Sequence, residues 1–160
     1  MSGPQMRRTG PLDLLVPFGI IGITAYVLLR TSYAQLPTLG YFVPVPLAAL
    51  GAVELVIARR VRAAVRHVAM ARPMTAIAIA RCVALGKASA LVGAAVCGAA
   101  VALLARVLPE SGDVRAAASD ARVAVLLLAS ALLVGLAGLV LERAGIDPNR
   151  ERRDPRDRQD

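Results

Sequence analysis

The chain has 160 residues, of which 57% are hydrophobic and 19% charged, and its formal net charge at pH 7 is +8. A soluble domain of this length has too little interior to bury so many Ala, Val and Leu side chains, which excludes an ordinary soluble globular protein. Residues 144–160 hold equal numbers of basic and acidic residues, so the excess positive charge belongs to the apolar body, and we expect no nucleic-acid partner.

Four apolar segments, separated by polar, basic or turn-rich stretches, predict transmembrane helices at about 12–29, 41–58, 83–105 and 123–141. Their lengths are close to the roughly 20 residues that cross a hydrocarbon core of about 30 Å, and the alternation typical of barrel strands is not seen. The predicted fold class is therefore all-α, an integral membrane four-helix bundle over residues 12–143. Residues 1–11 form an N-terminal segment, and 144–160 form a charged, disordered tail.

Residues 1–34 have a second interpretation, as a cleaved signal peptide. Arg7 and Arg8 precede the first apolar run, which ends in the small-residue pattern Ser32-Tyr33-Ala34. The run is longer than the roughly 7–15 apolar residues of a signal peptide, and Arg30 stands before the cleavage position, so we favour a retained helix.

Glu54 lies within the second apolar segment, five residues before Arg59. If the span ended before Glu54, only the thirteen residues 41–53 would remain, which is too short to cross the membrane. We therefore place Glu54 inside the membrane, where an ionisable side chain is by default a candidate functional site.

The loop 59–74 is basic. Arg59, Arg62 and Arg66 share one helical face, and valines share another. This pattern is typical of a helix that lies among anionic lipid headgroups, and equally of a solvated cytoplasmic loop. We expect the next helix to begin near Thr75.

Two cations mark the inner edge of the third span. Arg81 is expected among the lipid phosphates, and Lys87, about 9 Å further along the helix, at the boundary of the hydrocarbon. Because the second and third helices run in opposite directions, Lys87 and Glu54 should lie at similar depth, which predicts a Glu54–Lys87 ion pair. Glu54, Lys87 and Arg81 thus form a candidate intramembrane polar cluster, with Asp13 and Glu142 either joining it or capping helix ends.

Small residues recur every four positions along the third span, at Gly86, Ala90, Ala94 and Gly98. Such a face allows close approach of another helix in lipid. We expect the third helix to lie at the bundle centre or at an interface between copies of the chain.

The sequence predicts no metal, cofactor or catalytic site. Cys82 and Cys97 would be about 22 Å apart on one helix, beyond disulfide reach, and His67 is the only histidine. No motif with a known catalytic mechanism is present, so we do not expect an enzyme.

The distribution of basic residues predicts the orientation. Four arginines, Arg30, Arg106, Arg115 and Arg122, fall on one side of the predicted spans. Thirteen fall on the other: Arg7, Arg8, Arg59, Arg60, Arg62, Arg66, Arg72, Arg143, Arg150, Arg152, Arg153, Arg156 and Arg158. Because loops rich in Lys and Arg stay in the cytoplasm, both termini should be cytoplasmic, in a multi-pass protein of the bacterial plasma (inner) membrane.

Three stretches, LRTSYAQLP, ARCVALGKASALVG and LLVGLAGLVLERAG, together resemble an uncharacterised actinobacterial membrane-protein family, domain of unknown function 3180. The resemblance covers about residues 12–143. It implies a small four-span inner-membrane protein, and it supplies no activity and no catalytic residue.

Two functions fit these expectations. The first is a structural, scaffold or regulatory protein that docks other membrane or cytoplasmic proteins, or further copies of itself, in a bilayer with anionic headgroups. The alternative is a transport or ion-coupling module in which Glu54 titrates.

Overall fold

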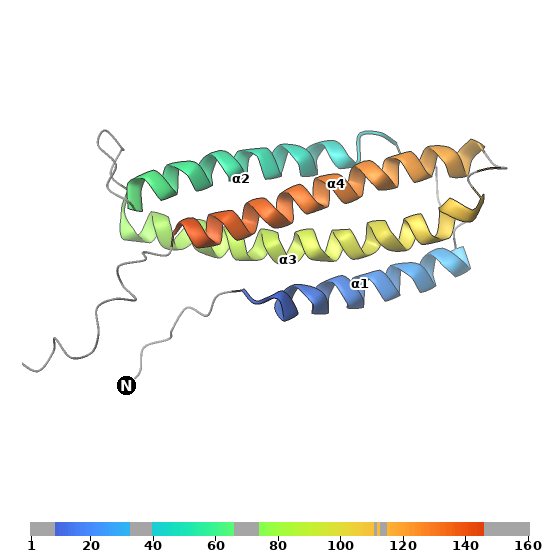
Figure 1. Ribbon diagram of the computed structural model, residues 1–160, viewed down its shortest axis with the longest axis horizontal. Coiled ribbons are helices and arrows are strands. Elements are labelled where there is room, and N and C mark those ends of the chain that lie inside the picture. Colours follow the sequence, from blue (N-terminus) through green and yellow to red (C-terminus); the bar gives the residue numbers. More distant parts are fainter. Residues whose placement is uncertain (1–8, 33–39, 66–73, 111, 113–114, 146–160) are drawn as a thin grey trace, which may run out of the picture.

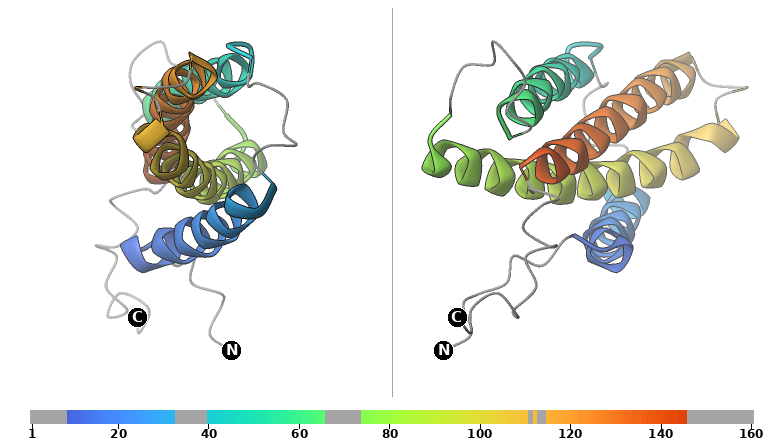
Figure 2. Two further views of the ribbon diagram at one scale, coloured as in Figure 1. Left: turned by 90° about the vertical axis from the view of Figure 1, so that its right-hand side faces the viewer. Right: turned by 60° about the vertical axis from the view of Figure 1, so that its left-hand side comes forward.

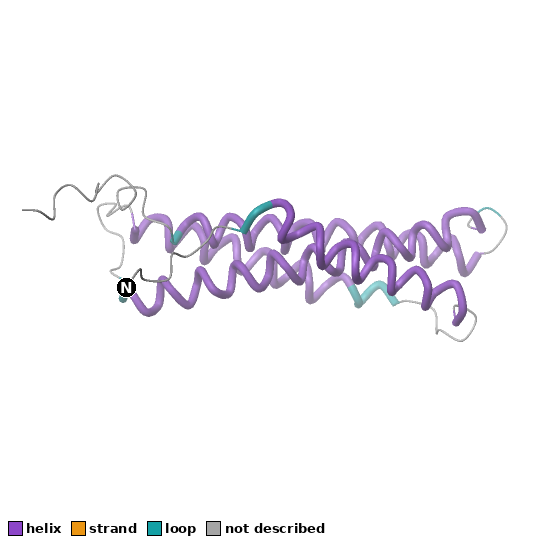
Figure 3. Tube along the Cα trace, turned by 90° about the horizontal axis from the view of Figure 1, so that it is seen from below, coloured by secondary structure: helices purple, strands orange, loops and turns teal. Residues whose placement is uncertain are grey.

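The protein is described here by a computed structural model, which covers residues 9–32, 40–65, 74–110, 112 and 115–145. Those residues form helices and short turns and contain no strand (Figures 1 and 3). The long helices are α1 (Pro11–Ser32), α2 (Pro44–Val65), α3 (Ala76–Val107) and α4 (Arg115–Ala144), and a single 3-10 turn, η2 (Leu108–Glu110), follows α3. The all-α prediction is confirmed. The predicted tail 144–160 lies outside the described residues beyond Gly145.

Three of these helices are long and apolar enough to cross a membrane: Pro11–Thr31, Ile77–Val107 and Arg115–Ala144. The helix α2 does not meet the same criterion, because Glu54 and three arginines fall within its 22 residues. It also begins later than we predicted. Tyr41 and Phe42 lie in a turn before Pro44, where the N–H of Val43 donates to the carbonyl of Gly40 at 3.2 Å.

The four helices lie side by side in the order α1, α3, α4, α2, and the row curves instead of closing into a square bundle (Figure 2). Successive helices run in opposite directions, so α1 is parallel to α3 and α2 is parallel to α4 (Figure 1). Within the described residues, α1 packs on α3 alone, and α2 packs mainly on α4. The helix α3 thus lies in the interior of the row, which confirms the first of the two positions predicted for it.

The interface between α3 and α4 is built from small residues at heptad spacing. On α3 the buried positions Gly86, Ala90, Gly93, Cys97 and Ala100 follow one another at intervals of four and three. On α4 the buried positions Ala117, Ala124, Ala131 and Gly138 follow at intervals of seven. This spacing keeps one seam turned toward the neighbouring helix, as in left-handed coiled coils and most membrane bundles.

The backbones of α3 and α4 touch where glycines face each other. A Cβ on Gly86 would stand 2.6 Å from the carbonyl oxygen of Gly138, and a Cβ on Gly93 would stand 2.7 Å from the Cα of Gly135. Side chains at Gly86 and Gly93 would therefore force these two helices apart.

The predicted packing face Gly86, Ala90, Ala94 and Gly98 does not serve a single neighbour. Residues four apart on an α-helix are turned by about 40° relative to each other, which adds up to about 120° between Gly86 and Gly98. Accordingly Gly86 and Ala90 lie against α4, whereas a Cβ on Gly98 would stand 3.0 Å from the backbone nitrogen of Gly22 in α1. The four-residue repeat follows α3 from one interface to the other, and Ala94 is only half-buried between them.

The first part of the predicted basic loop 59–74 is helical. α2 continues without a break to Val65, and Val61 is fully buried in an apolar cluster with Ala58, Leu141 and Ala144. The valine face of this segment thus packs against α4, and the position of its arginines among lipid headgroups stays a prediction.

The arginines of this segment lie on the other side of α2. Arg59 and Arg62 are exposed, while Arg66 and the rest of the loop to residue 73 lie outside the described residues. The following helix begins as predicted: Thr75 caps α3, its Oγ1 accepting the N–H of Ala78 at 3.3 Å.

Candidate functional site

Glu54 is the most deeply buried charged residue among those described, with no exposed surface. It occupies the packed seam of α2, whose buried positions Gly51, Glu54, Ala58 and Val61 again alternate intervals of three and four. Three residues before it, a Cβ on Gly51 would stand 3.2 Å from the backbone nitrogen of Val134, so α2 approaches α4 closely beside the carboxyl. The heptad seam of α2 thus carries Glu54 into the protein interior.

The partner of Glu54 is a hydroxyl of α3. Ser89, itself buried, donates through Oγ to Oε1 of Glu54. The second oxygen, Oε2, is buried and has no hydrogen-bond partner in the described part of the chain. One hydrogen bond therefore joins α2 to α3, two helices that otherwise touch little, and half of the carboxyl is unsatisfied.

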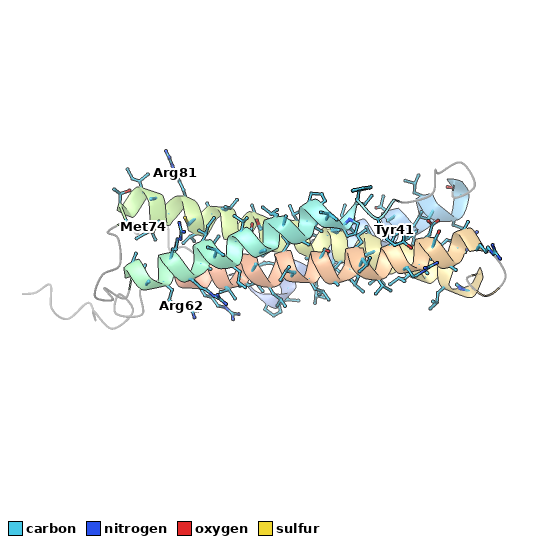
Figure 4. All side chains as sticks on the ribbon, turned by 90° about the horizontal axis from the view of Figure 1, so that it is seen from above. Tyr41, Arg62, Met74 and Arg81 are labelled. Carbon is cyan, nitrogen blue, oxygen red and sulfur yellow. The ribbon has the colours of Figure 1, made fainter. Side chains whose placement is uncertain are left out.

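The predicted cations lie elsewhere on α3. Lys87 is exposed and precedes Ser89 by two residues, which turns it by about 200° around the helix axis, away from the side that faces Glu54. Arg81 is exposed near the start of α3 and points away from the neighbouring helices (Figure 4). The depth predicted for Glu54 agrees with its bond to Ser89, but the predicted Glu54–Lys87 pair and the wider cluster with Arg81 gain no support from this arrangement.

A second buried carboxyl lies at the end of α4. Glu142 is 4% exposed, and its Oε1 accepts the backbone N–H of Thr9 at 2.8 Å. Its Oε2 and the Oγ1 of Thr9 are both buried without a partner. Glu142 therefore connects the last turn of α4 to the segment before α1. The sequence does not reveal this contact, because the two residues are 133 positions apart.

Two further polar residues of the described part make local hydrogen bonds. Asp13 caps its own helix, its Oδ2 accepting the N–H of Gly10 at 2.9 Å. Ser130 is buried and donates to the carbonyl of Leu126 in the preceding turn at 2.9 Å. Both cysteines are free thiols. No group of three His, Cys, Asp or Glu side chains that could hold a metal ion occurs among the described residues, and His67 lies outside them.

The chain matches one family model, described as "Protein of unknown function (DUF3180)", over residues 14–148. The matched region runs from the first turn of α1 past the end of α4, so it covers every helix described above. No curated protein and no solved structure matches the chain.

Proposed function

Because the chain belongs to this DUF3180 family of unknown function, its role has to be argued from its geometry, and we propose that it is a structural, scaffold or regulatory protein of the bacterial inner membrane. It docks other membrane or cytoplasmic proteins. The observation that carries this proposal is the open row of helices: α1 packs on α3 alone, and none of the residues in its span is buried.

The shape of α1 supports a docking role. Its outer residues Leu15, Ile20 and Ile23 are each more than half exposed, and Gly19 has open space around its Cα. Lipid covers such a face in an isolated protein, and a partner helix covers it in an assembly, since lipid and helix surfaces are equally apolar. Two buried carboxyls are engaged in contacts between separate parts of the chain, at Ser89–Glu54 and Thr9–Glu142.

The proposal includes α2 as a fourth span. Its uncharged ends, Pro44 and Ala58, enclose fifteen residues, about 22 Å of helix, which is shorter than a hydrocarbon core of about 30 Å. Arg59 and Arg62 extend the segment that can lie in the bilayer, because their long side chains can reach the headgroups while their stems stay in apolar surroundings. Support comes from α4, which lies parallel to α2 and in contact with it, so both helices occupy the same depth.

The orientation in the proposal has both termini in the cytoplasm, facing anionic headgroups. Among the described residues, exposed cations occur in the second half of α2 (Arg59, Arg60 and Arg62), in the first half of α3 (Arg81 and Lys87) and in the last turn of α4 (Arg143). Arg62 and Arg81 lie at the end of the molecule that holds the start of α3 (Figure 4). A cation near an anionic leaflet contributes about 1 kcal/mol, and arginine-rich loops remain on the cytoplasmic side. The proposal contains no catalytic step.

The test is a photo-crosslinking amino acid placed at Ile23 of α1 in the full-length protein in native membranes. We expect discrete protein adducts of one or a few masses. The matched control carries the same group at Leu132, an exposed position on α4. A result in which both positions yield only lipid adducts refutes docking through α1.

One observation favours the alternative, an ion-coupled transport role for Glu54: its Oε2 is buried without a partner. Flux in proteoliposomes separates the two functions, with Glu54→Gln as the variant and Glu142→Gln as the matched control. Transport predicts flux that Glu54→Gln abolishes and Glu142→Gln leaves in place. Absence of flux in the wild-type protein for protons and common monovalent cations supports the scaffold role.

A further inference from the structure

The buried carboxyl of Glu54 has an unusual set of neighbours. One oxygen accepts a hydrogen bond from Ser89, the other has no partner among the described residues, and the side chain has no exposed surface. An ionised carboxylate in such a place would keep a full negative charge with a single neutral donor, which is far more costly than burying a neutral polar group.

The charged groups nearest to Glu54 along the three packed helices do not offset such a charge. On α2, Arg59 is five residues further and exposed, and on α3, Lys87 projects from the side opposite to Ser89. On α4, the nearest titratable group is Glu142, which has the same sign of charge and accepts a hydrogen bond of its own. Among the described residues, the direct hydrogen-bond partner of the Glu54 carboxyl is thus the neutral hydroxyl of Ser89.

A metal ion does not fit the donor set. Zinc takes four ligands, calcium six to eight, and magnesium six. Within the described ranges, the protein oxygen that contacts the Glu54 carboxyl is a single serine hydroxyl. Nor do the surrounding backbones leave room for ligands, because α2 meets α4 at Gly51 and α3 meets α4 at Gly138, where added Cβ atoms would collide. A proton, by contrast, needs no coordination shell and no volume.

We propose that Glu54 is a proton-binding site, occupied at neutral pH, in which Ser89 donates to the carbonyl oxygen Oε1 and the bound proton sits on Oε2. This inference goes beyond the docking role. If the protein is an ion-coupled transporter, as in the alternative function, the proposed site rests on that function and identifies the coupled ion as the proton. The site lies about 7.5 Å from Arg59 along α2.

Infrared spectroscopy of the full-length protein in nanodiscs tests the proposal. We expect a carboxylic-acid C=O stretch at neutral pH that disappears in Glu54→Gln, which keeps the size of the side chain and an acceptor for Ser89. In Ser89→Ala the same band should move to higher wavenumber, because the carbonyl oxygen loses its hydrogen bond. The matched control Asp13→Asn, at an exposed helix cap, should leave the band unchanged.

Labelling with dicyclohexylcarbodiimide provides a second readout. The acid O–H adds across one C=N bond of the reagent, and the acyl group then migrates to nitrogen to give a stable N-acylurea, with no atom lost. We expect mass spectrometry to locate this adduct at Glu54 at neutral pH and to find less of it at alkaline pH.

If Glu54→Gln removes a carboxylate band instead of an acid band, the proposal is overturned, whatever the labelling shows. An acid band without labelling supports it and shows that the reagent cannot enter. Neither readout depends on docking or flux, so the proton site and the proposed functions can fail separately.

Discussion

The contact between Gly93 and Gly135 predicts opposite outcomes for the same substitution on its two sides. A Cβ on Gly93 would stand 2.6 Å from the nitrogen of Gly135, 2.7 Å from its Cα and 2.9 Å from the carbonyl oxygen of Ala131. A Cβ on Gly135 would meet only the backbone of Gly93, at 3.9 Å and beyond, which is ordinary van der Waals contact. Gly93→Ala should therefore separate α3 from α4, whereas Gly135→Ala fits in place.

The magnitude follows from two opposing terms. Replacing Gly by Ala in a helix gains at most about 1 kcal/mol, equally on both sides. Overpacking a tight interior costs about 1–3 kcal/mol, and the Gly93 variant should fall at the upper end because rigid backbone is the obstacle. We expect Gly93→Ala to lower the free energy of unfolding by about 1–2 kcal/mol or more, and Gly135→Ala to leave it unchanged or raise it by up to about 1 kcal/mol.

The assay is reversible unfolding in mixed detergent micelles, with sodium dodecyl sulfate as denaturant and helix content as the signal. Both variants are compared with the wild-type protein at the same detergent composition. Equal destabilisation by the two substitutions, or a neutral Gly93→Ala, would show that the backbones of α3 and α4 do not meet here.

Three further predictions use the same assay. Gly98→Ala should be destabilising because its Cβ would collide with the backbone of α1. Gly19→Ala has open space and should be neutral or stabilising by up to about 1 kcal/mol, and equal effects of the two substitutions would contradict the docking of α1 on α3. Ser89→Ala should cost about 1–3 kcal/mol, since it leaves a buried carboxyl without any donor. A double-mutant cycle of Glu54→Gln and Lys87→Gln should give a coupling energy below about 0.5 kcal/mol, because Lys87 leaves α3 on the side opposite to Ser89, which contacts Glu54. A larger coupling energy would support the predicted Glu54–Lys87 ion pair.

Sequence alone determined the helical class and the central part of each apolar helix, while α2 ends seven residues later, α3 begins seven residues earlier and α4 begins eight residues earlier than the predicted spans. Hydrophobic length and the placement of Thr75 are local properties, so they could be read without knowing the neighbours of a helix. The same kind of argument placed Glu54 inside the apolar segment. Apolar character placed the start of the second helix too early. Tyr41 and Phe42 are as apolar as the residues of a span, but they lie in the turn before Pro44, where α2 begins.

Tertiary structure decided the partners. Depth along a helix follows from counting residues at about 1.5 Å each, so the level of Glu54 opposite the region of Lys87 was predictable. Rotation about the helix axis does not follow from depth, and a turn of about 200° separates Lys87 from Ser89, the residue that actually contacts Glu54. The burial of Glu142 depends likewise on a contact with Thr9 across almost the whole chain. Which side of a helix meets which neighbour is set by the packing of all four helices together, and an apolar pattern that is rich in Ala and Gly nearly all round leaves that choice open.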